Sequence, residues 1–255
     1  MAQKSQNLPY SLHFALCSLL FVICSLFLLS CGIEDYPFIN PIPQGNIIQA
    51  MNNRAVVRIP SDSPGSTFTN FAVFYRIYVS DIPQASTTIN SYSAINPTLA
   101  SDYNSFRTYI DSTTQVNANM DSLFQGKGYK YLGLQDGNIN TVLSSSAFGQ
   151  SLTFDFTSSK LPTLTLGNST YVLWRSNGGG LFSPRPDRSF INSNELSNPD
   201  NINNQINADV VNKTGMPDGG MRYTYAAMFI VAVGSTGISD FYSTPSLIHV
   251  FLLPD

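Results

Sequence analysis

The chain has 255 residues and a formal net charge of −3. Only 11% of its residues are charged, whereas an average globular protein has about 25%. Neither sign of charge forms a long run, so binding to nucleic acid through a basic surface is not expected. Abundant Asn, Ser, Thr and Tyr instead predict an exported protein that is rich in β-strands.

The first 30 residues form an apolar leader. Residues 12–29 are apolar apart from His13 and a few Ser and Cys, and Lys4 is the only charge before them. This pattern predicts a secretory signal peptide over residues 1–30. A retained helical signal anchor is the alternative, because a run of about 18 apolar residues lies at the lower limit for crossing a bilayer.

The leader ends in the motif Leu28-Leu29-Ser30-Cys31, which resembles the lipobox of bacterial lipoproteins. The resemblance implies cleavage before Cys31 and attachment of lipid to its thiol, so that the membrane is a partner through this lipid. Gly32 replaces the Asp that retains members of this family at the inner membrane, which favours the outer membrane of the cell envelope. Removal of Cys17 and Cys24 with the leader would leave no thiol for a disulfide, a catalytic nucleophile or a metal site.

The mature chain begins with a segment that contains several prolines. Pro37, Pro41 and Pro43 lie within residues 33–44 and break any periodicity. We expect residues 31–45 to form an extended tether. An edge strand is the alternative, since proline is tolerated there. The folded domain is then predicted to span residues 46–255.

Four segments of the domain have the pattern of β-strands. They are rich in β-branched and aromatic residues, and turn-forming residues separate the last two, which we expect to form a hairpin. The segments are residues 55–60, 71–79, 223–233 and 246–252.

These segments resemble a fibronectin type III or other immunoglobulin-like domain. Residues 55–60 are similar to strand B, Phe74-Tyr75-Arg76-Ile77-Tyr78 is similar to the tyrosine-rich strand C, and Ile230-Val231-Ala232-Val233-Gly234 with residues 239–245 is similar to the hairpin of strands F and G. The resemblance implies a mostly β, two-sheet sandwich. Residues 83–220 would be a large mixed insertion between the C-like and F-like strands.

The expected insertion contains helices and strands. Asn96 and Pro97 can cap and open a helix, whose apolar residues are Leu99, Tyr103, Phe106 and Ile110. Met120, Leu123 and Phe124 predict a second, shorter helix. Further strands are expected at residues 129–134, 152–156, 163–166 and 171–174.

A long aperiodic stretch begins after residue 174 and is rich in Gly, Pro and Asn. Its first part mixes apolar residues with arginines, a composition typical of a recognition loop. In the alternative interpretation, Leu181 and Phe182 pack into the core. The predicted binding residues are Trp174, Arg175, Leu181, Phe182, Arg185 and Arg188.

The sequence gives little support for catalysis. His249 is the only histidine outside the leader, and we interpret it as a strand residue. No hydrolase, zinc-protease or phosphate-loop motif is present, although paired carboxylates far apart in sequence would escape this search. Residues 136–140 match the start of a calcium loop, but Thr141 replaces its glycine and Ala147 its glutamate, so a solvated turn without metal is expected. No cofactor is predicted.

These observations predict a lipid-anchored protein of the bacterial envelope that binds a protein or a glycan. One alternative is a structural or assembly component of the envelope. A second is a glycan-processing enzyme, which would need two carboxylates that face each other in a cleft.

Overall fold

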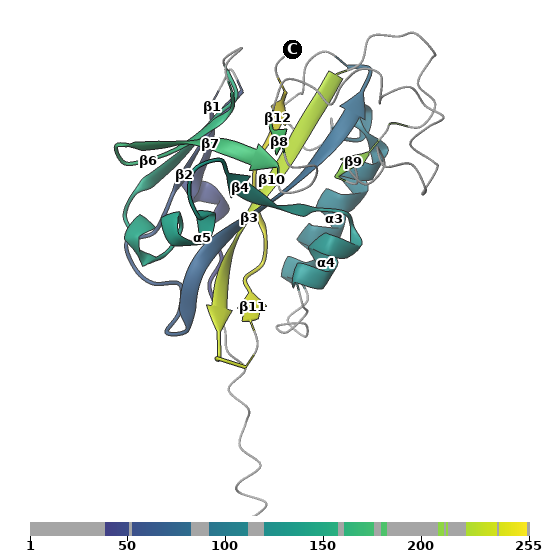
Figure 1. Ribbon diagram of the computed structural model, residues 1–255. Helices are drawn as coiled ribbons and strands as arrows, with labels where there is room; N and C mark the ends of the chain where they lie inside the picture. The colour runs from purple at the N-terminus through teal and green to yellow at the C-terminus, as the bar shows by residue number, and fades with distance from the viewer. Residues whose placement is uncertain are drawn as a thin grey trace, which may run out of the picture. The chain divides into compact units, whose positions relative to one another are not determined.

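One mostly antiparallel sheet organises the domain (Figure 1). The computed structural model describes residues 39–50, 53–82, 92–111, 120–157, 161–175, 180–182, 209–211, 213, 223–238 and 240–253. Residues 37–255 form a single unit. None of the helices described is long and apolar enough to cross a membrane.

Twelve strands belong to the sheet within the described residues. They are β1 (Ile47–Ala50), β2 (Arg54–Arg58), β3 (Phe68–Ser80), β4 (Lys130–Leu134), β5 (Ser151–Asp155), β6 (Thr163–Leu166), β7 (Ser169–Arg175), β8 (Gly180–Leu181), β9 (Val210–Val211), β10 (Tyr223–Ser235), β11 (Asp240–Tyr242) and β12 (Ser246–Leu252). Their order is β1-β2-β5-β6-β7-β4-β3-β10-β11, while β12 also pairs with β10, β8 with β7, and β9 with β3. Only the short β3–β9 pairing is parallel among the pairings described.

The described helices are short apart from one. They are α2 (Tyr92–Ile95), α3 (Pro97–Asp111), α4 (Met120–Gly126) and α5 (Ile139–Val142), with 3₁₀ turns η1 (Gln44–Asn46) and η3 (Ser145–Ala147). Helix α3 begins as predicted, because Oδ1 of Asn96 accepts a hydrogen bond of 3.0 Å from the amide of Thr98. Pro97 occupies the first helical position, where its missing N–H is not needed.

The sheet curves until its two ends meet, so that it is nearly closed into a barrel. Asn53, in the turn between β1 and β2, accepts a hydrogen bond of 2.7 Å from the amide of Leu252 in β12. Nε2 of Gln44 donates to the carbonyl of Leu247 in the same strand at 3.0 Å. These bonds hold β12 beside the β1–β2 hairpin.

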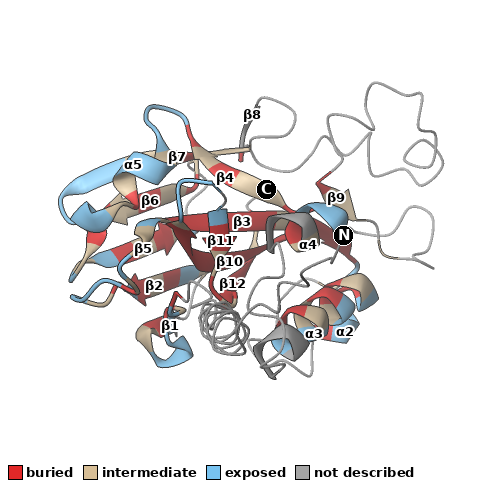
Figure 2. Ribbon diagram, turned by 90° about the horizontal axis from the view of Figure 1, so that it is seen from below, coloured by how far each residue is buried: buried red, intermediate tan, exposed pale blue. Residues whose placement is uncertain are grey.

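Two apolar clusters stabilise the sheet, one on each face. In Figure 2, β3 and β10 are buried over most of their length. Nearly every strand contributes alternate residues to the cluster that the curved sheet encloses, among them Val73, Phe154 and Ile230. The opposite face of β3 and β10 packs against α2, α3 and α4 through an aromatic cluster that includes Phe106 and Phe229. Because both of their faces are covered, β3 and β10 are apolar over most of their length.

The structure confirms a mostly β chain, but an immunoglobulin-like sandwich is not confirmed. Strand β3, the C-like segment, pairs with β10, and β10 pairs with both β11 and β12. The segment expected as an insertion is instead an integral part of the sheet, since β4 pairs with β3 and β5 pairs with β2. The sequence pattern located these strands correctly but carried no information about their partners.

The start of the domain also differs from the expectation. Ile39 and Ile42 are 3% and 2% exposed and belong to the enclosed cluster. The amide and the side-chain Nδ2 of Asn40 both donate to the carbonyl of Pro64. Residues 39–45, the described part of the predicted tether, are therefore packed on the domain, where burial removes Ile39 and Ile42 from water.

Candidate functional site

Of the predicted binding residues, Trp174 and Arg175 lie at the end of β7, where β8 and β4 flank it. Trp174 stands opposite Gly133 of β4 and Leu181 of β8. A Cβ atom on Gly133 would lie only 3.3 Å from the carbonyl oxygen of Trp174, so glycine permits this close approach of the two strands. The side chain of Trp174 is partly exposed.

Arg175, the next residue, is held by a buried carboxylate. Its Nε lies 2.9 Å from Oδ2 of Asp209, and its Nη2 lies 2.5 Å from Oδ1. The side chain of Arg175 is 12% exposed and that of Asp209 is fully buried. Burial acts to lower the pKa of Arg175, but the hydrogen bonds and charge of Asp209, with a smaller contribution from Tyr75, raise it above its ordinary value. Arg175 therefore stays charged and paired.

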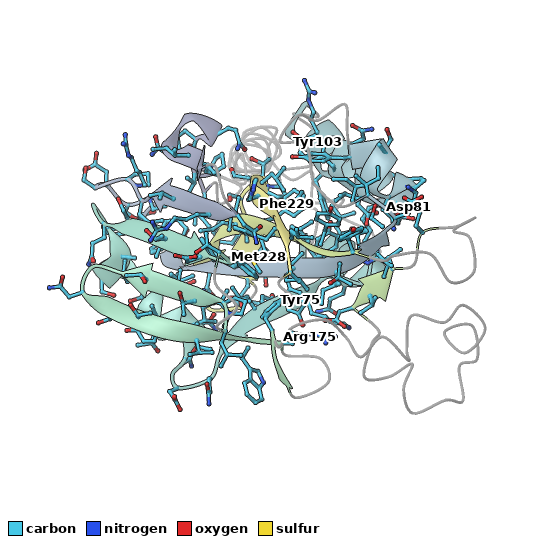
Figure 3. All side chains as sticks on the ribbon, turned by 90° about the horizontal axis from the view of Figure 1, so that it is seen from above. Tyr75, Asp81, Tyr103, Arg175, Met228 and Phe229 are labelled. Carbon is cyan, nitrogen blue, oxygen red and sulfur yellow. The ribbon has the colours of Figure 1, made fainter. Side chains whose placement is uncertain are left out.

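The side chain of Phe182 lies in the enclosed apolar cluster beside this region. Its ring meets that of Tyr75 at 4.8 Å and an interplanar angle of 70°, and it is 1% exposed. Tyr75 also lies beside Arg175 in Figure 3. Phe182 thus occupies the core, as in the alternative interpretation of the sequence.

The structure brings together only part of the predicted binding set. Arg175 and Phe182 gather around Tyr75, whereas Trp174 points to the opposite face of the sheet because successive strand residues alternate. The side chain of Leu181, together with Arg185 and Arg188, lies outside the described residues. Arg175 and Asp209 precede and follow the segment 176–208, so their ion pair joins its two ends.

A second polar cluster lies between β3 and the helices, and the sequence analysis did not identify it. Asp102 of α3 is 3% exposed. Its Oδ2 accepts hydrogen bonds from Nη1 of Arg76 at 2.8 Å and from the hydroxyl of Tyr78 at 2.7 Å. Its Oδ1 accepts one from Nζ of Lys127 at 3.1 Å. The hydroxyl of Tyr129 lies 2.8 Å from that of Tyr78.

The surroundings of Asp102 keep both phenols neutral. Burial, followed by the nearby Tyr129 and Asp102, raises the pKa of Tyr78 well above its ordinary value, and burial likewise raises that of Tyr129. The guanidinium of Arg76 lies 5.7 Å from the centre of the Tyr78 ring, a distance suited to a cation–π contact. Gly128 has a φ of +77°, and a Cβ there would lie 3.1 Å from Nη2 of Arg76. This arrangement fixes α3 to β3 rather than presenting a free base.

Two signals in the sequence could have located this cluster. Arg76 is the one charged residue in the apolar strand β3. Asp102 falls three positions after Leu99 and four before Phe106, so it lies on the buried face of α3. A carboxylate and a cation on two buried faces are expected to form an ion pair, because an unpaired buried charge is strongly unfavourable.

The remaining candidates from the sequence have local roles or lie outside the described residues. His249 is 6% exposed and its Nδ1 has no hydrogen-bond partner among the described residues. In the calcium-like segment, Oδ1 of Asn138 accepts from the amide of Asn140 at 2.9 Å and caps α5. No group of three or more His, Cys, Asp or Glu within the described ranges could hold a metal ion. Cys31 lies outside the described residues.

The chain was compared with protein-family models, with curated proteins and with solved structures, and no match was found.

Proposed function

We propose that the protein is a lipid-anchored component of a bacterial envelope, held through Cys31, and that it binds a protein or glycan with the segment between β7 and β9. The motif Leu28-Leu29-Ser30-Cys31 supports the anchor. Two or three acyl chains hold a protein firmly to a membrane, whereas one is marginal. Outer-membrane placement is part of the proposal, since Gly32 follows the cysteine.

The observation that carries the binding role is the ion pair of Arg175 and Asp209. This pair fixes both ends of residues 176–208 to the rigid sheet at a buried point. Binding residues are found disproportionately on loops that a rigid scaffold positions. Within the segment, Arg185 and Arg188 are the side chains that we expect to contact the partner, and the partly exposed Trp174 adds an aromatic surface beside it.

The anchor is tested by the intact mass of the membrane-extracted protein. We expect the mass of residues 31–255 plus acyl chains, and we expect Cys31→Ser to abolish this form. An unprocessed chain that keeps residues 1–30 would contradict the proposal and indicate a helical signal anchor.

The binding role is tested by substitution of Arg185 and Arg188 with alanine. Binding of the mature protein to a glycan array and to cross-linked envelope fractions is measured for the double variant Arg185→Ala/Arg188→Ala. Loss of two contact residues should weaken binding about tenfold or more. Arg107→Ala, which removes an exposed arginine from α3, is the matched control and should bind normally. Equal binding by all three proteins would contradict the role of the segment and favour a structural component that uses a sheet face.

A further inference from the structure

An isoleucine projects from the loop between β10 and β11 at the lower end of Figure 1. The side chain of Ile238 is 97% exposed, and the other large apolar side chain classed as exposed among the described residues, Ile48, is 39% exposed. The loop is held in shape by a hydrogen bond of 3.1 Å from the amide of Gly237 to the hydroxyl of Ser235. A single exposed apolar side chain is common on a protein surface, so the meaning of Ile238 depends on where it lies relative to the start of the domain.

The chain enters the domain at the same end. Asn40 donates to the carbonyl of Pro64 in the loop between β2 and β3. That loop is joined to the β10–β11 loop, because the amide of Ser235 donates to the carbonyl of Thr67 at 3.0 Å. The first described residues and Ile238 are therefore connected through one continuous set of hydrogen-bonded loops.

The length of chain before this point limits how far the domain can stand from its anchor. Seven residues, from Gly32 to Phe38, separate Cys31 from Ile39. Fully extended, they and the flanking bonds reach at most about 29 Å. Strand β3 has 13 residues and is about 43 Å long, so its far end cannot approach the anchor as closely as its start does.

We propose that the β2–β3 and β10–β11 loops rest on the lipid bilayer and that Ile238 inserts into its interfacial region. This inference rests on the proposed lipid anchor, which keeps the domain at the surface so that a single apolar side chain is enough to orient it. The lipid bilayer itself contacts the surface around Ile238.

The charges of the two loops define the kind of lipid contact. Asp62 and Asp240 are exposed at this end, and residues 59–67 and 236–239 contain no Lys or Arg. Anionic lipids would attract a basic surface, but they have no such attraction here. The contact is therefore apolar, it forms on zwitterionic lipid, and it does not depend on salt concentration.

A thiol label tests the contact. The three cysteines of the chain are Cys17, Cys24 and Cys31, so the lipidated mature protein offers no other thiol for labelling. Ile238→Cys is labelled with a fluorophore and the full lipidated protein is placed in phosphatidylcholine vesicles that carry a headgroup quencher. Ser93→Cys is the matched control, because Ser93 is exposed on α2, which the side chain of Asn96 ties to Val79 at the far end of β3.

We expect the quencher to reduce the fluorescence at position 238 about twofold or more relative to position 93, in low and in high salt, as for a side chain in the interface. Equal quenching at both positions of a protein that floats with the vesicles would overturn this inference alone. Failure of the protein with intact Cys31 to float would overturn both this inference and the proposed anchor.

Discussion

The guanidinium of Arg175 and the carboxylate of Asp209 form two hydrogen bonds across the base of the segment between β7 and β9. The two residues are 34 positions apart, and Asp209 is fully buried. A buried pair of this kind gains little over apolar residues, but removal of one partner leaves an uncompensated charge. The pair therefore acts as a fixed point for the segment.

We expect Asp209→Asn to lower the free energy of unfolding by about 3 kcal/mol, because Arg175 would remain charged and buried without its counter-ion. Urea unfolding monitored by the fluorescence of the single tryptophan measures this loss. The exposed pair of Arg54 and Asp155 supplies the control, since the side chain of Arg54 is 52% exposed. Arg54→Met should cost less than about 1 kcal/mol, and similar losses in both variants would contradict the buried role of Asp209.

We expect substitutions within the Asp102 cluster to lower the free energy of unfolding by unequal amounts. Asp102→Ala leaves Arg76 and Lys127 unpaired and removes the carboxylate that accepts from the Tyr78 hydroxyl, so we expect a loss of about 3–5 kcal/mol. Lys127→Met should cost about 1 kcal/mol, because Asp102 keeps Arg76 and Tyr78 and the lysine is already 23% exposed. Urea unfolding of both variants checks this order. Equal destabilisation would mean that Lys127, rather than the carboxylate, holds α3 in place.

We expect the variants Asn53→Ala and Asn53→Gly to differ in stability. Its φ of +61° is in the left-handed region, which asparagine and glycine tolerate better than other residues. Its Nδ2 also donates to the carbonyl of Phe156 at 2.8 Å. Asn53→Ala loses the side-chain bonds and strains the backbone, so it should cost about 1 kcal/mol more than Asn53→Gly, which loses the bonds alone. Thermal unfolding of the two variants compares them, and equal stability would show that backbone strain at this position is negligible.

Local patterns in the sequence predicted single elements better than their arrangement. Alternation located β5, a run of aromatic and β-branched residues located β10, and the Asn96-Pro97 pair located the start of α3, because these signals depend on neighbouring residues. The partners of the strands depend on contacts between distant segments, so the pairing of β5 with β2 was not foreseen. The Arg175–Asp209 pair was missed for the same reason, since Asp209 lies in a stretch without periodicity.

We expect burial of His249 to make the stability of the fold depend on pH in mild acid. Its ring meets that of Phe251 edge to face at 4.9 Å, and burial lowers its pKa from 6.5 to about 4. Between pH 6.5 and about 4, the unfolded chain binds a proton at this residue and the folded chain does not. The stability that neutral His249 contributes is therefore complete above pH 6.5. It is lost as the pH falls toward 4, by about 3 kcal/mol in total at roughly 1.4 kcal/mol for each unit of the shift.

The variant His249→Leu isolates this contribution, because it cannot titrate and keeps an apolar side chain at the position. Asp81 and Asp155 also have lowered pKa values, the first through its bond to Lys213 and the second because bonds from Thr157 outweigh the effect of burial. Both residues remain in the two proteins and cancel in the comparison. Urea midpoints at pH 7.5 and pH 4.5 should fall much further for the wild type than for the variant. A parallel fall in both proteins would mean that His249 becomes protonated in the folded state without cost, and that β12 opens to water around this residue in mild acid.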